Sequence, residues 1–198
     1  MTNTTQEDQA GLDSEGRLVD TAVADALVAA VKGQPGTIAA YKQEAKKQNQ
    51  PLAFALSDIT ALASAKFGYS AEDVLNTCQA LYETHKLTSY PRTDCAYLPE
   101  SQHADAPRVL EAIKHVNPEL AGLVDGADPR IKSKTWDDSK ITAHHGIVPT
   151  MQKGSKAALS ERERNIYDLI VRAYLAQFYP LHEYMQTTVG VEIAGENF

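Results

Sequence analysis

The chain has 198 residues, 43% of them hydrophobic and 23% charged, which is typical of an ordinary soluble globular protein. This length suits one domain of good size, or one domain with part of a second. The formal net charge of −7 excludes the overall basic footprint of most DNA-binding domains. Any contact with nucleic acid would need a local basic groove, and we expect the chain alone to bind phosphates weakly.

The sequence also argues against a membrane protein, a secreted protein and a protein stabilised by zinc or disulfides. No apolar run approaches the roughly 20 residues that span a bilayer, and the polar N-terminus does not look like a signal peptide. We therefore expect a cytoplasmic location and no membrane partner. Cys78 and Cys95 lack the spacing of a zinc site or of a disulfide framework.

The N-terminal part is predicted to hold a disordered leader, one helix and one strand. Residues 1–14 are polar, with almost no apolar anchors. A helix is predicted over Val19–Val31, with its apolar face formed by Val19, Val23, Leu27 and Ala30. The Gly33–Gly36 turn ends it, and a strand is predicted over Thr37–Gln43.

A helical region is predicted to begin at Pro51. Ser57 is the expected N-cap of a helix over 58–67, and Gly68 is its expected stop. Ser70 starts a second capped helix, predicted to end near 85–86. Such a helix pair resembles a helix-turn-helix, but pairs of this kind are common and do not by themselves imply DNA contact.

Two more helices and a strand complete the predicted fold. One helix is predicted from about Ala106 to the Asn117–Pro118 break. The other is predicted over 161–178, behind a Ser160/Glu163 capping box, and is followed by a strand over 185–193. The two strands are expected to pair, which gives a mostly α fold with a small antiparallel β element.

The most informative stretch follows the second helix of the pair. Pro91 biases Tyr90 toward an extended backbone, and Arg92 and Asp94 come next. A nearby guanidinium favours a phenolate and can neutralise a phosphate under attack. The alternative is a buried tyrosine with Arg92 in a surface ion pair, and residue types alone favour it. We expect Tyr90 and Arg92 to face opposite ways unless the turn at Pro91 brings them together.

Several blocks, in the right order, resemble type IA DNA topoisomerases, most closely the bacterial topoisomerase III branch. The similarity runs from about residue 15 to the C-terminus. The tyrosine block carries the strongest likeness, and Ala143–Thr150 is similar to the histidine motif of the family. The blocks are Pro51–Ser57, Lys66–Ser70, Tyr82–Lys86, Ser89–Leu98, Ala143–Thr150, Tyr167–Ile170 and Tyr174–Phe178.

The resemblance implies a fold and a reaction. The helical catalytic-tyrosine domain, residues 51–178, would be inserted between two segments of a β-rich arch domain, residues 15–50 and 179–198. Tyr90 would attack a phosphate of single-stranded DNA to form a 5′-phosphotyrosine link, which allows a strand to pass before religation without ATP. Arg92 and His144 would complete the catalytic set, and we expect all three residues to lie close together.

The resemblance also implies accessory residues and missing parts. Lys86, Asp94, Lys140 and His145 are the expected DNA-binding residues. Asp94 either orients Arg92 or caps the local turn, and Trp136 either stacks a base or packs in the core. The adjacent histidines lack further ligands at a suitable spacing, so no metal site is predicted.

The chain resembles only part of a topoisomerase. The Mg²⁺ expected in the full-length enzyme would belong to a toprim domain, which is absent from this sequence together with most of the arch. The isolated chain is therefore expected to be inactive. Two alternatives stay open: a non-catalytic helical DNA-binding module, and a protein-interaction domain with a buried tyrosine.

Overall fold

The computed structural model describes residues 11–141 and 143–198. These residues separate into two compact units, residues 11–46 with 183–198, and residues 47–182. The predicted disorder of residues 1–10 lies outside the described residues. For residues 11–14 the prediction is wrong, because the Gly11 carbonyl oxygen accepts the backbone N–H of Val19 over 2.8 Å and Leu12 bridges to Leu18.

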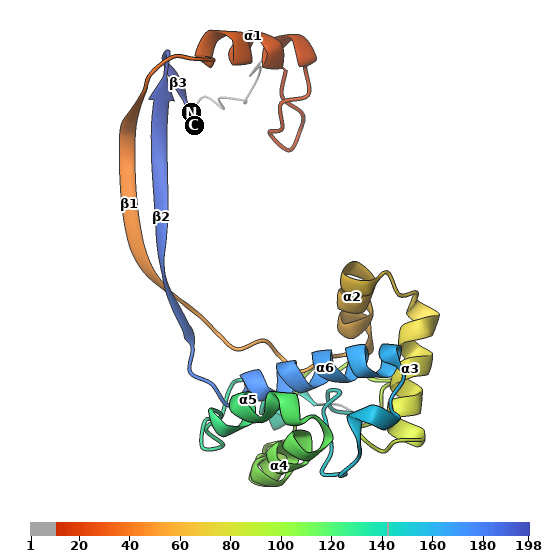
Figure 1. Cartoon of the computed structure of the whole chain (residues 1–198). Helices are drawn as coiled ribbons and strands as arrows, with labels where there is room; N and C mark the ends of the chain where they lie inside the picture. Colours follow the sequence, from red (N-terminus) through yellow and green to blue (C-terminus); the bar gives the residue numbers. More distant parts are fainter. Residues whose placement is uncertain (1–10, 142) are drawn as a thin grey trace, which may run out of the picture. The chain divides into compact units, whose positions relative to one another are not determined.

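The first unit contains helix α1 (Thr21–Val31) and a three-stranded antiparallel sheet in the order β1-β2-β3. The long strands β1 (Gly36–Gln48) and β2 (His182–Ile193) lie side by side (Figure 1). Their predicted pairing is confirmed. The short β3 (Glu196–Asn197) was not predicted; it folds back on β2 through a turn in which Ala194 and Gly195 have φ values of 53° and 86°.

The apolar faces predicted for this unit are not covered. None of the described residues of the unit is buried, and Val19 is 62% exposed. The 3.6-residue and two-residue periodicities thus identified the helix and strands correctly. Periodicity cannot show what an apolar face packs against, because the covering surface comes from elsewhere.

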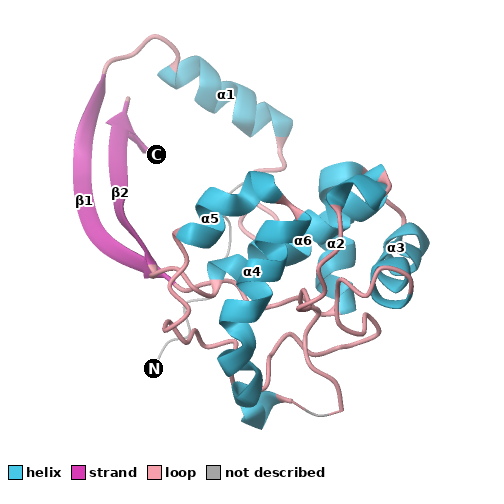
Figure 2. Cartoon of the chain, turned by 60° about the horizontal axis from the view of Figure 1, so that its bottom comes forward, coloured by secondary structure: helices cyan, strands magenta, loops and turns pink. Residues whose placement is uncertain are grey.

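The second unit is helical, with long connecting loops (Figure 2). Its longer helices are α2 (Leu56–Phe67), α3 (Ala71–Glu83), α4 (Ala106–Val116) and α6 (Glu161–Ala176), and α5 (Ala121–Asp125) is a short one. Short 3₁₀ helices occur at η1 (Glu100–Asp105), η2 (Pro118–Leu120), η3 (Asp138–Lys140) and η4 (Lys156–Ala158). The predicted helices are all present; η2 and α5 lie where only a short turn around Glu119–Val124 was predicted, and the other 3₁₀ helices were not predicted.

Most predicted helix ends agree with the structure, and one N-cap is wrong. Gly68 stops α2 in the left-handed conformation, with φ of 71°, and Ser70 and Ser160 cap α3 and α6 as expected. Helix α2, however, begins at Leu56 rather than 58, so Ser57 is not its cap. The Asp58 carboxylate instead accepts the backbone N–H of Ala55 over 3.1 Å, so the helix starts two residues earlier, with Ala55 as its N-cap.

Helix α6 forms the centre of the core, since α2 and α3 pack against it and eight of its residues are buried. Directly after it, Gln177 is fully buried and tied to three parts of the chain. Its amide nitrogen donates to the carbonyl oxygens of Pro51 and Ala173, both over 2.7 Å, and its amide oxygen accepts the Ser133 hydroxyl over 2.5 Å. These bonds fix the start of the unit and the loop before the histidine motif onto α6.

Candidate active site

The tyrosine segment leaves α3 through a residue with an unusual backbone. Lys86 has φ of 58°, a left-handed conformation that non-glycine residues adopt rarely. The Thr150 hydroxyl donates to the Lys86 carbonyl oxygen over 2.6 Å, and the Thr150 N–H donates to that of Leu87 over 3.0 Å. Thr150, at the end of the histidine motif, therefore holds the turn that leads to Tyr90.

Ser89 joins the tyrosine segment to the histidine motif. Its hydroxyl donates to the Gly146 carbonyl oxygen over 3.1 Å and accepts the backbone N–H of Val148 over 3.0 Å. The Ser89 N–H donates to the Val148 carbonyl oxygen over 2.9 Å. One serine side chain thereby sets the register between the residues that flank Tyr90 and those that flank His144.

Gly146 allows the histidine motif to lie close to two other segments. Its N–H donates to the Tyr97 carbonyl oxygen over 2.8 Å. A Cβ at this position would lie 2.9 Å from the Cβ of Ala53 and 3.3 Å from the carbonyl carbon of Ala96. The glycine is needed for this close approach, because no side chain fits there.

Tyr90, Arg92 and Asp94 share one face of the segment. The backbone is irregular, as expected: Thr93 donates its N–H to the Pro91 carbonyl oxygen over 3.0 Å. Tyr90 and Arg92 are both exposed, with the bend at Pro91 between them, which agrees with the exception allowed for a turn at Pro91. Burial alternates accordingly along the segment: Tyr90, Arg92 and Asp94 are exposed, while Pro91, Thr93 and Cys95 are buried.

The structure brings Tyr90 and His144 together. Their ring centroids lie 5.1 Å apart, although the two residues come from different motifs. On another side, Tyr82 of α3 meets the Tyr90 ring edge-on at 5.6 Å, and the Lys86 ammonium lies 5.8 Å from the Tyr82 ring centroid. Tyr90 is 36% exposed, so the alternative of a buried tyrosine does not agree with the structure.

Arg92 and Asp94 make no hydrogen bond or ion pair within residues 11–141 and 143–198. The turn is instead capped by Thr93, whose hydroxyl accepts the N–H of Cys95 over 3.0 Å. Neither role expected for Asp94 is therefore seen in the described chain. The Arg92 guanidinium is exposed and is available to a ligand.

The remaining candidates differ in how firmly they are held. Lys140 is exposed at the end of η3, and its carbonyl oxygen lies 3.6 Å from the Cys95 sulfur, which places it beside the tyrosine segment. His145 is half-buried: its Nδ1 lies 2.8 Å from the Gly146 carbonyl oxygen, and its Nε2 lies 3.2 Å from the Gln102 amide nitrogen.

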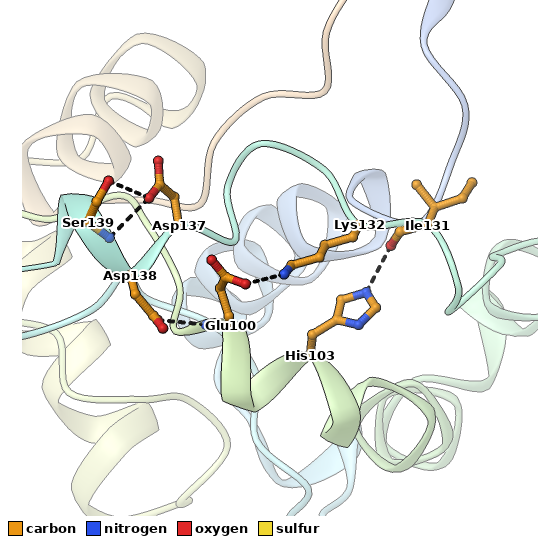
Figure 3. A network of polar contacts seen from close by, with 7 residues as sticks. All are labelled: Glu100, His103, Ile131, Lys132, Asp137, Asp138 and Ser139. Atoms are coloured by element: carbon orange, nitrogen blue, oxygen red, sulfur yellow. Dashed lines mark hydrogen bonds and ion pairs between the residues drawn. The ribbon is translucent and has the colours of Figure 1, made fainter.

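A polar network anchors the loop that leads into the histidine motif (Figure 3). The Asp138 carboxylate accepts the Glu100 N–H over 2.9 Å at the start of η1, and Glu100 also forms an ion pair with Lys132. His103 Nε2 donates to the Ile131 carbonyl oxygen over 3.0 Å. These contacts fix η1 and the loop together on one side of the histidine motif.

Trp136 packs in the core and is 4% exposed, with its ring against His103, Tyr174 and Phe178. Of the two roles considered for Trp136, the structure shows packing in the core. Among the described residues, no group of three or more His, Cys, Asp or Glu side chains gathers to hold a metal ion.

The sequence motifs did not reveal which residues organise the site. Ser89 and Gly146 were present in the matched blocks but were assigned no role. Tyr82 also lies in a matched block without an assigned role, yet it is half-exposed and contacts Tyr90. Tyr82 lies near the end of α3, eight residues before Tyr90, and no periodic pattern links the two residues.

Comparison with known proteins identifies the family. The family model described as DNA topoisomerase matches residues 1–198, the whole chain. The chain belongs to the DNA topoisomerase family. The type IA, topoisomerase III-like resemblance drawn from the sequence is thereby confirmed.

Curated relatives of this topoisomerase chain are much longer than it is. DNA topoisomerase 3 from Vibrio cholerae is 42% identical over 94% of this chain and 29% of its own length. DNA topoisomerase 3 from Salmonella typhimurium is 40% identical over 94% of this chain and 28% of its own length. The chain thus spans less than a third of these relatives.

The fold is also similar to that of a solved topoisomerase. Full-length topoisomerase I from Thermotoga maritima superposes with a TM-score of 0.58 and 20% identity, over 93% of this chain and 30% of that one. No helix in the described part of the chain is both long and apolar enough to cross a bilayer.

Proposed function

We propose that this chain is the tyrosine-bearing part of a type IA DNA topoisomerase, in which Tyr90 attacks a backbone phosphate of single-stranded DNA. The observation that carries the proposal is the contact between Tyr90, exposed at the surface, and His144 at 5.1 Å. A nucleophile must be reachable by a polymer substrate, and the cationic groups must converge on the same phosphate.

The proposed step exchanges one phosphodiester for another. A bond forms between the Tyr90 phenolic oxygen and phosphorus, and the bond from phosphorus to the 3′ oxygen breaks. The phenol gives its proton to solvent or a base, and the 3′ oxygen takes up one, leaving a 3′ hydroxyl and a 5′-phosphotyrosine link. Religation is the reverse, so no nucleoside triphosphate is needed.

The neighbouring side chains have distinct proposed roles. Arg92 offsets charge on the non-bridging oxygens as it develops, and His144 orients the phosphate beside the phenol. Lys86 and Lys140 contact the strand backbone, and His145 contributes to the same surface. Asp94, next to Arg92 on the exposed face, keeps the guanidinium directed toward the substrate once DNA is bound.

The domain assignment is part of the proposal. Residues 51–178 form the tyrosine domain, and 15–50 and 179–198 are segments of the arch. The described acidic and histidine residues do not provide a cluster suited to Mg²⁺. We assign the magnesium of the complete enzyme to a toprim domain of the same polypeptide.

Covalent capture of DNA tests the proposal. The complete polypeptide, mixed with labelled single-stranded DNA and Mg²⁺ and then denatured, should retain label on a denaturing gel. Tyr90→Phe should abolish the adduct, whereas Tyr97→Phe, in the same segment, should keep it. An adduct that survives Tyr90→Phe contradicts the assignment, and DNA binding without any adduct supports a non-catalytic module instead.

A further inference from the structure

A cavity of about 250 Å³ lies next to the two motifs. Its walls come from the tyrosine segment, η1, α4, the loop that carries Trp136, the histidine motif with the residues after it, and α6. Ser89, Gln102, Asp105, Val109, His145 and Met151 line it, together with the rings of Trp136 and Tyr174.

The cavity shares its walls with the candidate site. Ser89 directly precedes Tyr90 and His145 directly follows His144. The hydrogen bond from the Ser89 hydroxyl to Gly146 holds these walls at a fixed separation. A strand whose phosphate reaches Tyr90 would therefore have a neighbouring nucleotide close to this cavity.

The polar groups of the cavity suit the edge of a base. The Gly146 carbonyl oxygen can only accept, so His145 Nδ1 carries the proton and its Nε2 accepts from the Gln102 amide. Gln102 then keeps its amide oxygen and a second N–H without a partner in the described chain. An adjacent acceptor and donor on one planar amide can pair with an edge of a nucleobase.

The remaining wall chemistry favours a neutral, flat group over a phosphate. Val109, Met151 and the buried Tyr174 ring supply apolar surface. Asp105 also lines the cavity, where its negative charge disfavours a phosphate; it forms an ion pair with Arg108, whose side chain is 67% exposed. Pockets for drug-sized ligands measure about 300–1,000 Å³, so this one suits a smaller group.

We propose that the cavity receives one unstacked base of the strand that Tyr90 attacks, with Gln102 contacting the base edge. The inference rests on the proposed function and extends it, because it makes this cavity a determinant of where the strand is cut. Lifting a base out of a single strand costs little, and the apolar walls and the amide offset that cost.

An abasic scan of the substrate tests the inference in the complete polypeptide. Single-stranded oligonucleotides, each lacking one base at a different distance from the cleavage point, are compared for affinity and for covalent capture. One abasic position should lower both by about tenfold, the scale of a single base contact. The other positions should have smaller effects.

Two variants connect that position to the cavity. Met151→Trp fills the cavity from its exposed rim, and Gln102→Ala removes the edge contact without adding bulk. In both variants, the affinity and the covalent capture of the intact oligonucleotide should fall to the values of the abasic one, so the difference between the two oligonucleotides disappears. Leu123→Trp, which adds the same bulk at a separate hollow of the second unit, should leave the effect intact.

The outcomes separate this inference from the function it rests on. Suppose that no oligonucleotide is captured covalently, but one abasic position still weakens binding and Met151→Trp abolishes that difference. The proposed attack by Tyr90 is then wrong, whereas the base site is supported. If no position is selective, or if selectivity survives both variants, the base site is wrong. Suppose instead that a free nucleoside monophosphate stabilises the protein against heat, that Met151→Trp abolishes this effect, and that no abasic position is selective. This result would show that the cavity binds a free nucleotide and not a base of the strand, and it would overturn the proposal.

Discussion

The hydroxyl of Ser89 donates to the carbonyl oxygen of Gly146 over 3.1 Å, across 57 residues of sequence. This bond joins the segment that presents Tyr90 to the segment that presents His144. Because the same hydroxyl also accepts the N–H of Val148, one side chain satisfies two backbone groups of the histidine motif. The spacing between the two rings therefore depends on a residue that takes no part in the chemistry.

Ser89→Ala should destabilise the chain and separate the motifs. The Val148 N–H and the Gly146 carbonyl oxygen would each lose a partner, which costs about 1–3 kcal/mol at a buried position. Urea unfolding of the 198-residue chain measures the loss. Ser139→Ala, which removes an exposed serine hydroxyl bonded to Asp137, should cost much less, and equal losses would contradict the coupling.

Gly146→Ala should be destabilising because the new methyl group would meet Ala53. Overpacking of this kind costs about 1–3 kcal/mol. Adding Ala53→Gly should recover part of that loss by clearing the nearest atom, as urea titration of the single and double variants would show. Gly122→Ala provides the control, since nothing lies within 4 Å of its added Cβ and it sits in helix α5, so stability should rise slightly. A harmless Gly146→Ala would refute the close-approach argument.

Arg92→Ala should leave stability unchanged and reduce covalent capture of DNA. The guanidinium is exposed and makes no bond in the described chain, so folding does not depend on it. Loss of one group that stabilises developing charge typically lowers a rate about 100- to 1,000-fold. Single-turnover capture by the complete polypeptide measures this, with Arg17→Ala in the first unit as the control; capture at the normal rate would remove Arg92 from the mechanism.

The N-terminus of α6 should lose stability in acid through Glu163. Burial pushes the pKa of Glu163 up, but the N–H and hydroxyl of Ser160 and the His85 ring outweigh this and leave the pKa below 4.5. Since the folded-state pKa lies below the unfolded one, the stabilisation is complete above about pH 4.5 and disappears as the pH falls through the folded-state value.

Glu163→Gln isolates this contribution. Glutamine can still accept the Ser160 N–H, so the substitution removes only the charge, which should cost about 0.3–1 kcal/mol at neutral pH, and the difference from the native chain should shrink below about pH 4.5. Unfolding free energies measured between pH 3 and 7 by urea titration provide the comparison. Glu161→Gln, in the same exposed helical turn, is the control, and a difference that grows in acid would reverse the sign and refute the account.

Cys78 should resist thiol reagents in the folded chain. Burial raises the pKa of its thiol to about 12, and the thiolate is the reactive form. Iodoacetamide at pH 8, followed by peptide mass spectrometry, should leave Cys78 unmodified without denaturant and modify it in urea. Similar modification in both conditions would show that α3 opens far more readily than its buried face indicates.

The sequence predicted local structure better than it predicted the contacts that build the site. Caps at Ser70 and Ser160 were read correctly because their signals lie within one helical turn. Ser57 was misread because Asp58, one residue on, bonds the N–H of Ala55 and moves the start. Local signals compete, and tertiary contacts of the Ala53–Leu56 segment decide between them.

The candidate site shows the same limit. The resemblance named Tyr90, Arg92 and His144, but the geometry between Tyr90 and His144 depends on Ser89, Gly146 and other contacts distant in sequence. No periodic pattern encodes a hydrogen bond between loops 57 residues apart. Trp136 was left between stacking and core packing for a related reason, since a single tryptophan has no local pattern that separates core from surface.

Because of the antiparallel ribbon of β1 and β2, backbone amides in the two units should exchange with solvent at very different rates. No described side chain of its unit is buried, and a two-stranded ribbon alone is marginally stable in water. Its amide deuterons should therefore be lost through small, frequent openings. Those of α6, enclosed by the core, should be lost only when the whole helical unit unfolds. Deuterium exchange of this one chain would accordingly report two separate opening free energies rather than a single value.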